Sequence, residues 1–286
     1  MPSETMRLSL VIPVYNEADV IGLCLDHVVA QTHPIDEVVV VDNNSTDGTR
    51  AVVEGYLGRL PLRIVDEKTQ GVRSARTAGF DSSTGDVVGR IDADTRLDPQ
   101  WTRRLRDFFM TNADVSGVMG ATYPYDSPVD GPMRRSAVKL AKTSARRGDM
   151  KAPGLYGANC ALRKNAWTAA RQHLLDDDDL HEDLDLYYGV IESGGVVRFL
   201  PTLLAGQSAR RFAASFGSNL RYLHAAFRTR GRHGDKKGVA VLCLTYFPNL
   251  INLIVMRALV APFDPVSRQW SLRNLRRSRV SPVDLV

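Results

Sequence analysis

Short apolar runs alternate with amphipathic segments through the first hundred residues. Residues 8–14 (LSLVIPV) and 37–42 (EVVVVD) are almost continuously apolar, which is typical of strands buried on both faces of a parallel sheet. Residues 17–31 carry apolar side chains at helical spacing, and residues 47–58 predict a second helix. The alternation continues with a strand at 62–67, a helix of small residues at 71–83 and a fourth strand that ends in DVVGRIDAD (86–94).

This alternation predicts an α/β fold. Strands separated by helices of this length form βαβ units with right-handed connections, so we expect a Rossmann-like, mostly parallel sheet flanked by helices. Beyond about residue 150 the pattern changes to a short strand and turn leading into a helix (154–167), an acidic loop leading into a helix (174–195) and a further strand (196–201). The 286 residues, 44% of them hydrophobic, suffice for one large domain with an appendage.

The most apolar segment is residues 239–260, VAVLCLTYFPNLINLIVMRALV. Three arrangements stay open for it: a helical pair that is buried or forms a homodimer, a hairpin on a membrane surface, and a single membrane span. Pro248, Asn249, Asn252 and Arg257 count against the simple span.

Basic residues flank this segment. Residues 210–237 hold eight Lys and Arg against Asp235 alone, and five arginines lie between 268 and 279. Such a charge distribution suits phosphate groups or an anionic membrane surface, although an ordinary solvated face has the same composition. The sequence therefore predicts a helical, basic and apolar C-terminal extension, with peripheral contact to a membrane as one use of it.

The cysteines and the N-terminus indicate the compartment. Cys24, Cys160 and Cys243 lie far apart without a CxxC spacing, which argues against a disulfide framework or a zinc site. The first residues lack the basic and apolar stretches of a signal peptide. We expect a cytoplasmic protein, with the inner face of the cell membrane as its alternative location.

Polar residues follow three of the predicted strands: YNE, DNNS and DAD. In open α/β sheets, ligands bind beyond the carboxyl ends of the strands, so these clusters are expected to converge at one edge. Two carboxylates at the end of a buried strand, Asp92 and Asp94, become favourable when a divalent cation lies between them and a diphosphate. Mg²⁺ or Mn²⁺ suits such oxygen ligands and would neutralise a departing diphosphate.

Together these motifs resemble the family-2 inverting glycosyltransferases of GT-A fold. The resemblance covers residues 8–211 and rests on five segments in order: VIPVYNEADVI, VVVVDNNSTDGT, GVRSARTAGF, RIDADT and HEDLDL. It implies a GT-A domain over residues 1–211, with a nucleotide-binding half (1–100) and an acceptor and catalytic half (101–211). Residues 212–286 would form the C-terminal extension.

The resemblance also assigns the nucleotide-binding residues. Pro13, Tyr15 and Glu17 match the loop that holds the nucleobase, and Asp42 matches the acid that receives the ring N–H of the base. Arg76 matches an arginine that reaches the nucleotide. Each has a structural alternative, because such residues also end strands, cap helices or pair with surface carboxylates.

The DxD triplet is Asp92-Ala93-Asp94. By the same resemblance, Asp92 and Ala93 lie near the ribose of the nucleotide sugar, and Asp94 binds the metal, Mn²⁺ or Mg²⁺. DxD triplets are common on solvated turns, so the position of this one after a buried strand is what strengthens the assignment.

Asp183 matches the catalytic base. It would remove a proton from an acceptor hydroxyl while that oxygen attacks the anomeric carbon of a nucleoside-diphosphate sugar, inverting the configuration. Glu182 and the acidic run 176–179 compete for this role. The implied process is cell-envelope glycan or glycolipid synthesis, with a hydroxyl acceptor that a lipid could carry and no nucleic-acid partner.

The sequence departs from the family pattern in three places. Asn43 stands where a second acid is usual, and Thr77 replaces an amide after Arg76. The histidine that often completes the metal site is absent from AGQSARR, so Ser208 or water would substitute for it.

Three other classes of function are alternatives to a glycosyltransferase. No GxGxxG follows the first strand, which counts against a dinucleotide-dependent oxidoreductase. A nucleotidyltransferase would need a glycine-rich, basic first loop, whereas this one carries Glu17 and Asp19. A non-catalytic homologue that binds nucleotide sugars stays open because of Asn43 and the missing histidine.

Overall fold

The N-terminal half of the central sheet is parallel. The computed structural model describes residues 6–144 and 150–276. Four strands lie in the order β3-β2-β1-β4, all with parallel pairing: β1 (Leu8–Val14), β2 (Glu37–Asp42), β3 (Leu62–Asp66) and β4 (Val87–Arg90). The connections are α1 (Ala18–Val29), α2 (Thr49–Glu54) and α3 (Val72–Ser82). The predicted strand and helix alternation is confirmed here, with helix ends shifted by a few residues.

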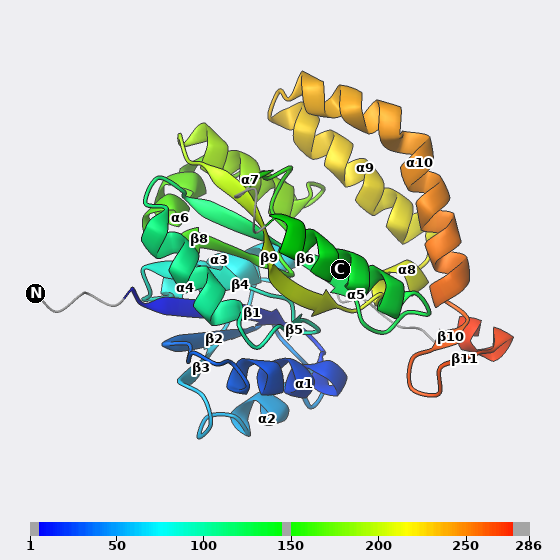
Figure 1. Ribbon diagram of the computed structural model, residues 1–286, viewed down its shortest axis with the longest axis horizontal. Helices are drawn as coiled ribbons and strands as arrows, with labels where there is room; N and C mark the ends of the chain where they lie inside the picture. The colour runs from blue at the N-terminus through cyan, green and yellow to red at the C-terminus, as the bar shows by residue number, and fades with distance from the viewer. Residues whose placement is uncertain (1–5, 145–149, 277–286) are drawn as a thin grey trace, which may run out of the picture.

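The two central strands, β1 and β2, are buried on both faces because helices cover the sheet from both sides (Figure 1). On one side, α1 inserts Ile21, Leu25 and Val28 into the core. On the other side, α3 approaches so closely that a Cβ on Gly79 would lie 2.3 Å from Cγ1 of Val11. The glycine therefore sets how near α3 packs to the sheet, and with it the position of the arginines that α3 carries.

The C-terminal half of the sheet is mixed. β8 (Cys160–Arg163) pairs antiparallel with both β4 and β6 (Gly117–Pro124), and β6 pairs parallel with β9 (Val197–Gln207). Two short strands, β5 (Arg96–Leu97) and β7 (Met150–Lys151), pair antiparallel with β9. The helices of this half are α4 (Trp101–Thr111), α5 (Asp130–Ser144), α6 (Lys164–Ala170) and α7 (Glu182–Glu192). The strand expected at 196–201 continues to Gln207. Its last residues pair with β5, the short strand that follows the DxD triplet.

The chain ends in a helical hairpin beside this domain (Figure 1). After the short α8 (Arg210–Ala213), α9 (Phe216–Arg232) and α10 (Lys236–Val260) pack against each other, and a small pair of strands follows, β10 (Phe263–Asp264) and β11 (Gln269–Trp270). Gly234 makes the turn between the helices with φ +67°, and Asp235 begins α10 by accepting a hydrogen bond from Gly238 N–H at 2.8 Å.

The expectation of a helical pair within 239–260 is wrong. That segment forms one helix, α10, and its partner in the hairpin is α9. Pro248 lies inside α10, which bends in its middle (Figure 1). A proline removes one backbone hydrogen bond and bends a helix, but packing on either side lets the helix continue.

Candidate active site

The polar clusters after β1, β2 and β4 lie at one edge of the sheet, as the parallel topology requires. Pro13 pairs with Val41 across β1 and β2, and Tyr15 follows half-buried. Asp42 ends β2, is buried, and accepts a hydrogen bond from the backbone N–H of Ser45 at 3.0 Å. These residues stand where the resemblance places a nucleobase, and their contact with one stays a prediction.

Asn43 has a structural role that explains its amide. Its Nδ2 donates to the carbonyls of Glu67 and Thr69, both at 2.8 Å, and its Oδ1 accepts from Gly71 N–H at 2.8 Å. A carboxylate could not make the two donor contacts. Asn43 therefore ties the β3–α3 loop to the end of β2, next to the candidate nucleotide site.

A partly buried arginine joins the first loop to the DxD triplet. Arg210, in α8 just beyond β9, contacts both carboxylate oxygens of Glu17 at 2.7 and 2.5 Å, and its Nε lies 2.8 Å from Oδ2 of Asp94. Burial raises the pKa of Asp94 to about 6, with the carboxylates of Glu17 and Asp126 adding to the shift that Arg210 opposes. In this structure Glu17 thus holds Arg210, and its contact with a nucleobase stays a prediction.

Ser208, the residue expected to substitute for the missing histidine, contacts a different acid. Its hydroxyl donates to Asp126 at 2.6 Å, while Arg210 occupies the position beside Asp94. Among residues 6–144 and 150–276, no group of three or more His, Cys, Asp or Glu side chains is arranged to hold a metal ion by itself. Asp94 offers a single carboxylate for a cation, which fits a weakly caged Mg²⁺ or Mn²⁺ whose other ligands are phosphate oxygens and water.

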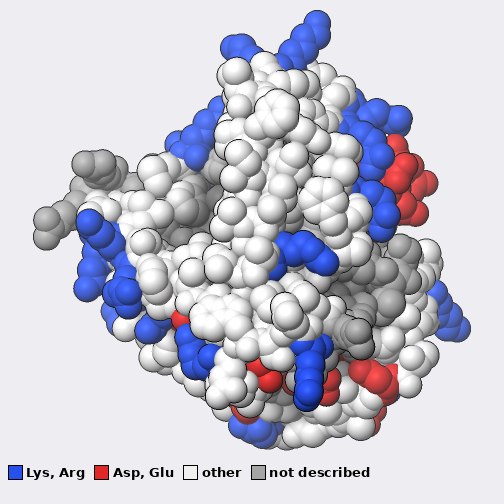
Figure 2. All heavy atoms as spheres, turned by 90° about the vertical axis from the view of Figure 1, so that its right-hand side faces the viewer, with Lys and Arg blue, Asp and Glu red and all other residues white. Residues whose placement is uncertain are grey.

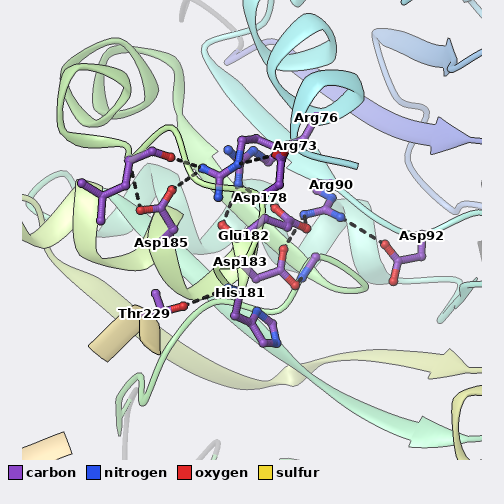
Figure 3. Close-up of polar contacts among 12 residues, drawn as sticks. Arg73, Arg76, Arg90, Asp92, Asp178, His181, Glu182, Asp183, Asp185 and Thr229 are labelled. Carbon is purple, nitrogen blue, oxygen red and sulfur yellow. Dashed lines mark hydrogen bonds and ion pairs between the residues drawn. The ribbon is translucent and has the colours of Figure 1, made fainter. Parts of the chain in front are cut away.

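A second arginine, this one buried, links the DxD triplet to the candidate base (Figure 3). Arg90, the last residue of β4, contacts Glu182 Oε1 at 2.6 Å, Asp183 Oδ1, and Asp92 Oδ1 at 3.4 Å. Its side chain is 3% exposed, and the surrounding carboxylates raise its pKa above the ordinary value despite burial. The sequence does contain a signal for it, because Arg90 is the one charge inside an otherwise apolar run, but the motifs alone do not assign it.

Arg76 lies in this second cluster. Its Nη1 donates to the carboxylate of Glu182 at 2.6 Å and to the Glu182 carbonyl at 2.7 Å, and its side chain is fully buried (Figure 3). The arginine that was expected to reach the nucleotide therefore fixes the first turn of α7 in this structure. Neighbouring Arg73 does the same for Asp185, at 2.7 Å.

The candidates for the base differ in their surroundings. Both carboxylate oxygens of Glu182 contact buried guanidinium groups, and burial raises its pKa. Asp183 contacts Arg90 with one oxygen and accepts a hydrogen bond from Gly157 N–H at 2.8 Å with the other. A Cβ on Gly157 would lie 2.3 Å from Cζ of Arg90, so this close approach needs glycine. Asp178, in the acidic run, is fully exposed, as expected for a solvated loop.

Replacing Arg90 by leucine should lower the free energy of unfolding by about 3–5 kcal/mol, because it leaves the buried Glu182 and Asp183 without their shared counter-charge. Urea unfolding followed by circular dichroism measures this. The matched control is Arg103→Leu on α4, since Arg103 is 56% exposed and pairs with Asp107 at 3.6 Å; it should change stability by less than about 1 kcal/mol. Equal effects of the two substitutions would contradict the structural role of Arg90.

Comparisons with known proteins agree with this geometry. The model of the family described as Glycosyl transferase family 2 matches residues 9–168. The glycosyltransferase AglE of Haloferax volcanii is 37% identical over 160 residues, which cover 50% of this chain and 52% of the relative. The undecaprenyl-phosphate 4-deoxy-4-formamido-L-arabinose transferase of Sodalis glossinidius is 30% identical over 181 residues, covering 61% and 52%. The chain spans about half the length of these curated relatives.

Solved structures share the fold. The mannosyltransferase PcManGT from Pyrobaculum calidifontis, in complex with GDP-Man and Mn²⁺, has a TM-score of 0.58 at 20% identity and covers 91% of this chain and 86% of its own. TarS 1-349 of S. aureus, in complex with UDP-GlcNAc, has a TM-score of 0.56 at 16% identity and covers 78% and 65%. The predicted α/β fold of GT-A type is confirmed, and the chain belongs to glycosyl transferase family 2.

Proposed function

We propose that this protein is an inverting glycosyltransferase that moves a sugar from a nucleoside-diphosphate sugar to an acceptor hydroxyl, with Mn²⁺ or Mg²⁺ as cofactor. One observation carries the proposal. Arg90 lies between Asp92 of the DxD triplet and Asp183 at the start of α7, so a donor at the first would present its anomeric carbon toward the second. We propose the same division of labour for the chain: residues 1–100 bind the nucleotide and 101–211 supply the base and the acceptor site.

On the donor side, Asp42 would accept the N–H of the nucleobase, and Asp92 with Ala93 would lie along the ribose. Asp94 would hold the divalent cation, which supplies positive charge to the departing diphosphate when bound. Arg210 already places a positive charge at this carboxylate. The GDP-Man and Mn²⁺ bound by PcManGT and the UDP-GlcNAc bound by TarS support a donor of this class.

On the acceptor side, Asp183 would take the proton of the attacking hydroxyl. Its contacts with Arg90 and Gly157 N–H fix the orientation of the carboxylate, which is what a general base requires. A single displacement inverts the anomeric centre, so a second carboxylate is not needed as a nucleophile. The Sodalis relative is named as an undecaprenyl-phosphate sugar transferase, which supports an acceptor attached to a lipid. We place the reaction in envelope glycan synthesis, on the cytoplasmic side of the membrane, as part of this proposal.

Thermal unfolding with UDP, GDP and dTDP, each with and without Mn²⁺, tests the donor class. At about 100 times the dissociation constant, a nucleotide that binds only the folded state should raise Tm by roughly 5–10 °C, and only when Mn²⁺ is present. NAD⁺ is the control and should have no effect. Stabilisation by NAD⁺ alone would contradict the proposal. If one of the three nucleotides stabilises the protein, its sugar conjugates are tested next for metal-dependent hydrolysis.

A further inference from the structure

The longest helix of the chain is also its most exposed apolar element. Over its 25 residues, α10 buries only Leu253, Met256 and Val260, and the last two pack against Phe212 and Ala213 of α8. Large apolar side chains elsewhere on α10 are left in solvent, among them Leu244 at 81%, Phe247 at 70% and Ile251 at 61% exposure. Side chains three and four residues apart lie on the same side of a helix, so these three form one face, the α10 apolar face.

The same helix is the one segment of the described chain whose length and hydropathy match a membrane-crossing helix. Its position does not favour a simple span, because its C-terminal part packs on the catalytic domain and its middle is bent at Pro248. A helix of 25 residues is about 37 Å long, so α10 can lie along a bilayer surface and contact it over several helical turns.

Positive charge surrounds the α10 apolar face. Figure 2 shows a white ridge on this side of the molecule, with blue side chains at its upper end and along both flanks, and red side chains beside the blue ones on the right flank. Lys236 and Lys237 begin the helix and are exposed, Arg257 lies near its end, and exposed Arg273 follows. Residues 210–275 contain eleven Lys and Arg but only two acids, Asp235 and Asp264. Five of the arginines pair with acids of the chain, Arg210 among them in the candidate active site, so Lys236, Lys237 and Arg273 are the groups that the proposal uses.

We propose that the α9–α10 hairpin docks on an anionic lipid bilayer. The α10 apolar face enters the interfacial region, and the lysines and arginines around it contact lipid phosphates. The charge decides between this partner and a second copy of the chain. Two copies that met through α10 would bring both sets of positive groups together, whereas an anionic bilayer neutralises them.

The hairpin is fastened to the candidate active site, so docking also fixes where that site lies. Thr229 of α9 accepts a hydrogen bond from the backbone N–H of His181 at 2.8 Å (Figure 3). The ring of Tyr222, also on α9, lies 4.5 Å from that of His181. Beyond α9, His233 Nε2 lies 2.9 Å from Asp185 on α7. A bilayer under α10 would thus lie beside the helix that carries Asp183, within reach of an acceptor held in the membrane.

The test is flotation of the full chain with phosphatidylcholine vesicles that contain or lack phosphatidylglycerol. The wild-type protein should bind only the anionic vesicles, more weakly as salt rises. The triple variant Leu244→Glu, Phe247→Glu, Ile251→Glu should weaken binding by about 100-fold or more, because it removes three inserting side chains and adds like charge. The single variant Phe247→Glu should weaken it in the same direction, which guards against misfolding of the triple variant.

The matched control places the same three charges on exposed apolar positions elsewhere: Leu23→Glu on α1, Leu57→Glu in the turn after α2 and Met110→Glu on α4, at 51%, 51% and 70% exposure. It should bind anionic vesicles like the wild type, apart from a small loss from net charge. Lys236→Glu with Lys237→Glu should weaken binding at low salt by at least about tenfold, and acids suit the first turn of a helix, so α10 should persist.

The proposal would be overturned by a wild-type protein that ignores anionic vesicles, or by a triple variant that binds them as the wild type does. A wild-type dimer that ignores vesicles and becomes a monomer in the triple variant would assign the face to a second copy instead. Vesicle binding requires no sugar donor, so its failure would leave the proposed transferase reaction untouched.

Discussion

Replacing Asp183 by asparagine is expected to lower turnover by about 10²–10⁴-fold while donor affinity changes little. Asparagine keeps the shape of the side chain and can still accept the Gly157 N–H, but it cannot take a proton from a hydroxyl. Arg90 retains Glu182 and Asp92 as partners in this variant, so the fold should persist. The rate of sugar transfer and the dissociation constant of the nucleoside diphosphate, measured on the same preparation, separate the two effects.

Glu182→Gln is the companion variant. Glu182 pairs with both Arg76 and Arg90, so the loss of its charge should lower the free energy of unfolding. Urea unfolding measures this change. Asp183→Asn should leave that free energy closer to the wild-type value. A well-folded Glu182→Gln enzyme that is inactive, beside an active Asp183→Asn enzyme, would show that the base is Glu182.

Replacing Asp94 by alanine is expected to abolish metal-dependent donor binding. Asp94 follows β4 and contacts Arg210, which also pairs with Glu17. Its removal would leave the cation of a bound diphosphate without the protein ligand that we propose for it. The phosphate oxygens alone hold Mn²⁺ far more weakly in the site than with a carboxylate. Titration with nucleoside diphosphate, with and without Mn²⁺, should show the metal-dependent increase in affinity in the wild type and lose it in the variant.

Asp98→Ala provides the control for Asp94. Asp98 follows four residues later, is 30% exposed and pairs with Arg104 at 3.0 Å, so its loss changes local charge without touching the donor edge. It should keep the Mn²⁺-dependent affinity of the wild type. If Asp94→Ala kept that affinity as well, the metal would have to be assigned to other residues.

The sheet was predictable because each of its first four strands is a local pattern. Continuous apolar runs, each followed by polar residues, identify β1, β2 and β4. Because these strands are parallel, their carboxyl ends lie at the same edge of the sheet. The family motifs add Asp183, because HEDLDL is itself a local signal.

The two arginines that hold the candidate site together could not be predicted in the same way. Arg90 meets Glu182 across 92 positions of sequence, and Arg210 meets Glu17 across 193. The sequence around Arg210 does not distinguish it from the other basic residues of 210–237. Its contact with Glu17 depends on where β9 ends, which the sequence pattern does not give. Long-range ion pairs are set by packing, so a pattern read along the chain does not contain them.

The apolar segment shows a different limit. Its composition fits a buried helix, a dimer and a membrane contact equally well, and only the exposure of Leu244 and Phe247 separates the buried arrangement from the others. Pro248 suggested a break, but a proline that removes one hydrogen bond is outweighed by the many that remain in a helix of 25 residues.

The cluster around Arg90 has a consequence for how a proton is received. Arg76 and Arg90 contribute two positive charges, and Asp92, Glu182 and Asp183 contribute three negative ones, so these five side chains carry one excess negative charge. A proton on Asp183 would bring the net charge of these five side chains to zero. Arg90 would then have two charged partners left, Asp92 and Glu182. If Asp183 is the base, as proposed, the proton transfer would therefore leave this group without excess charge, which is favourable next to the buried Arg76 and Arg90.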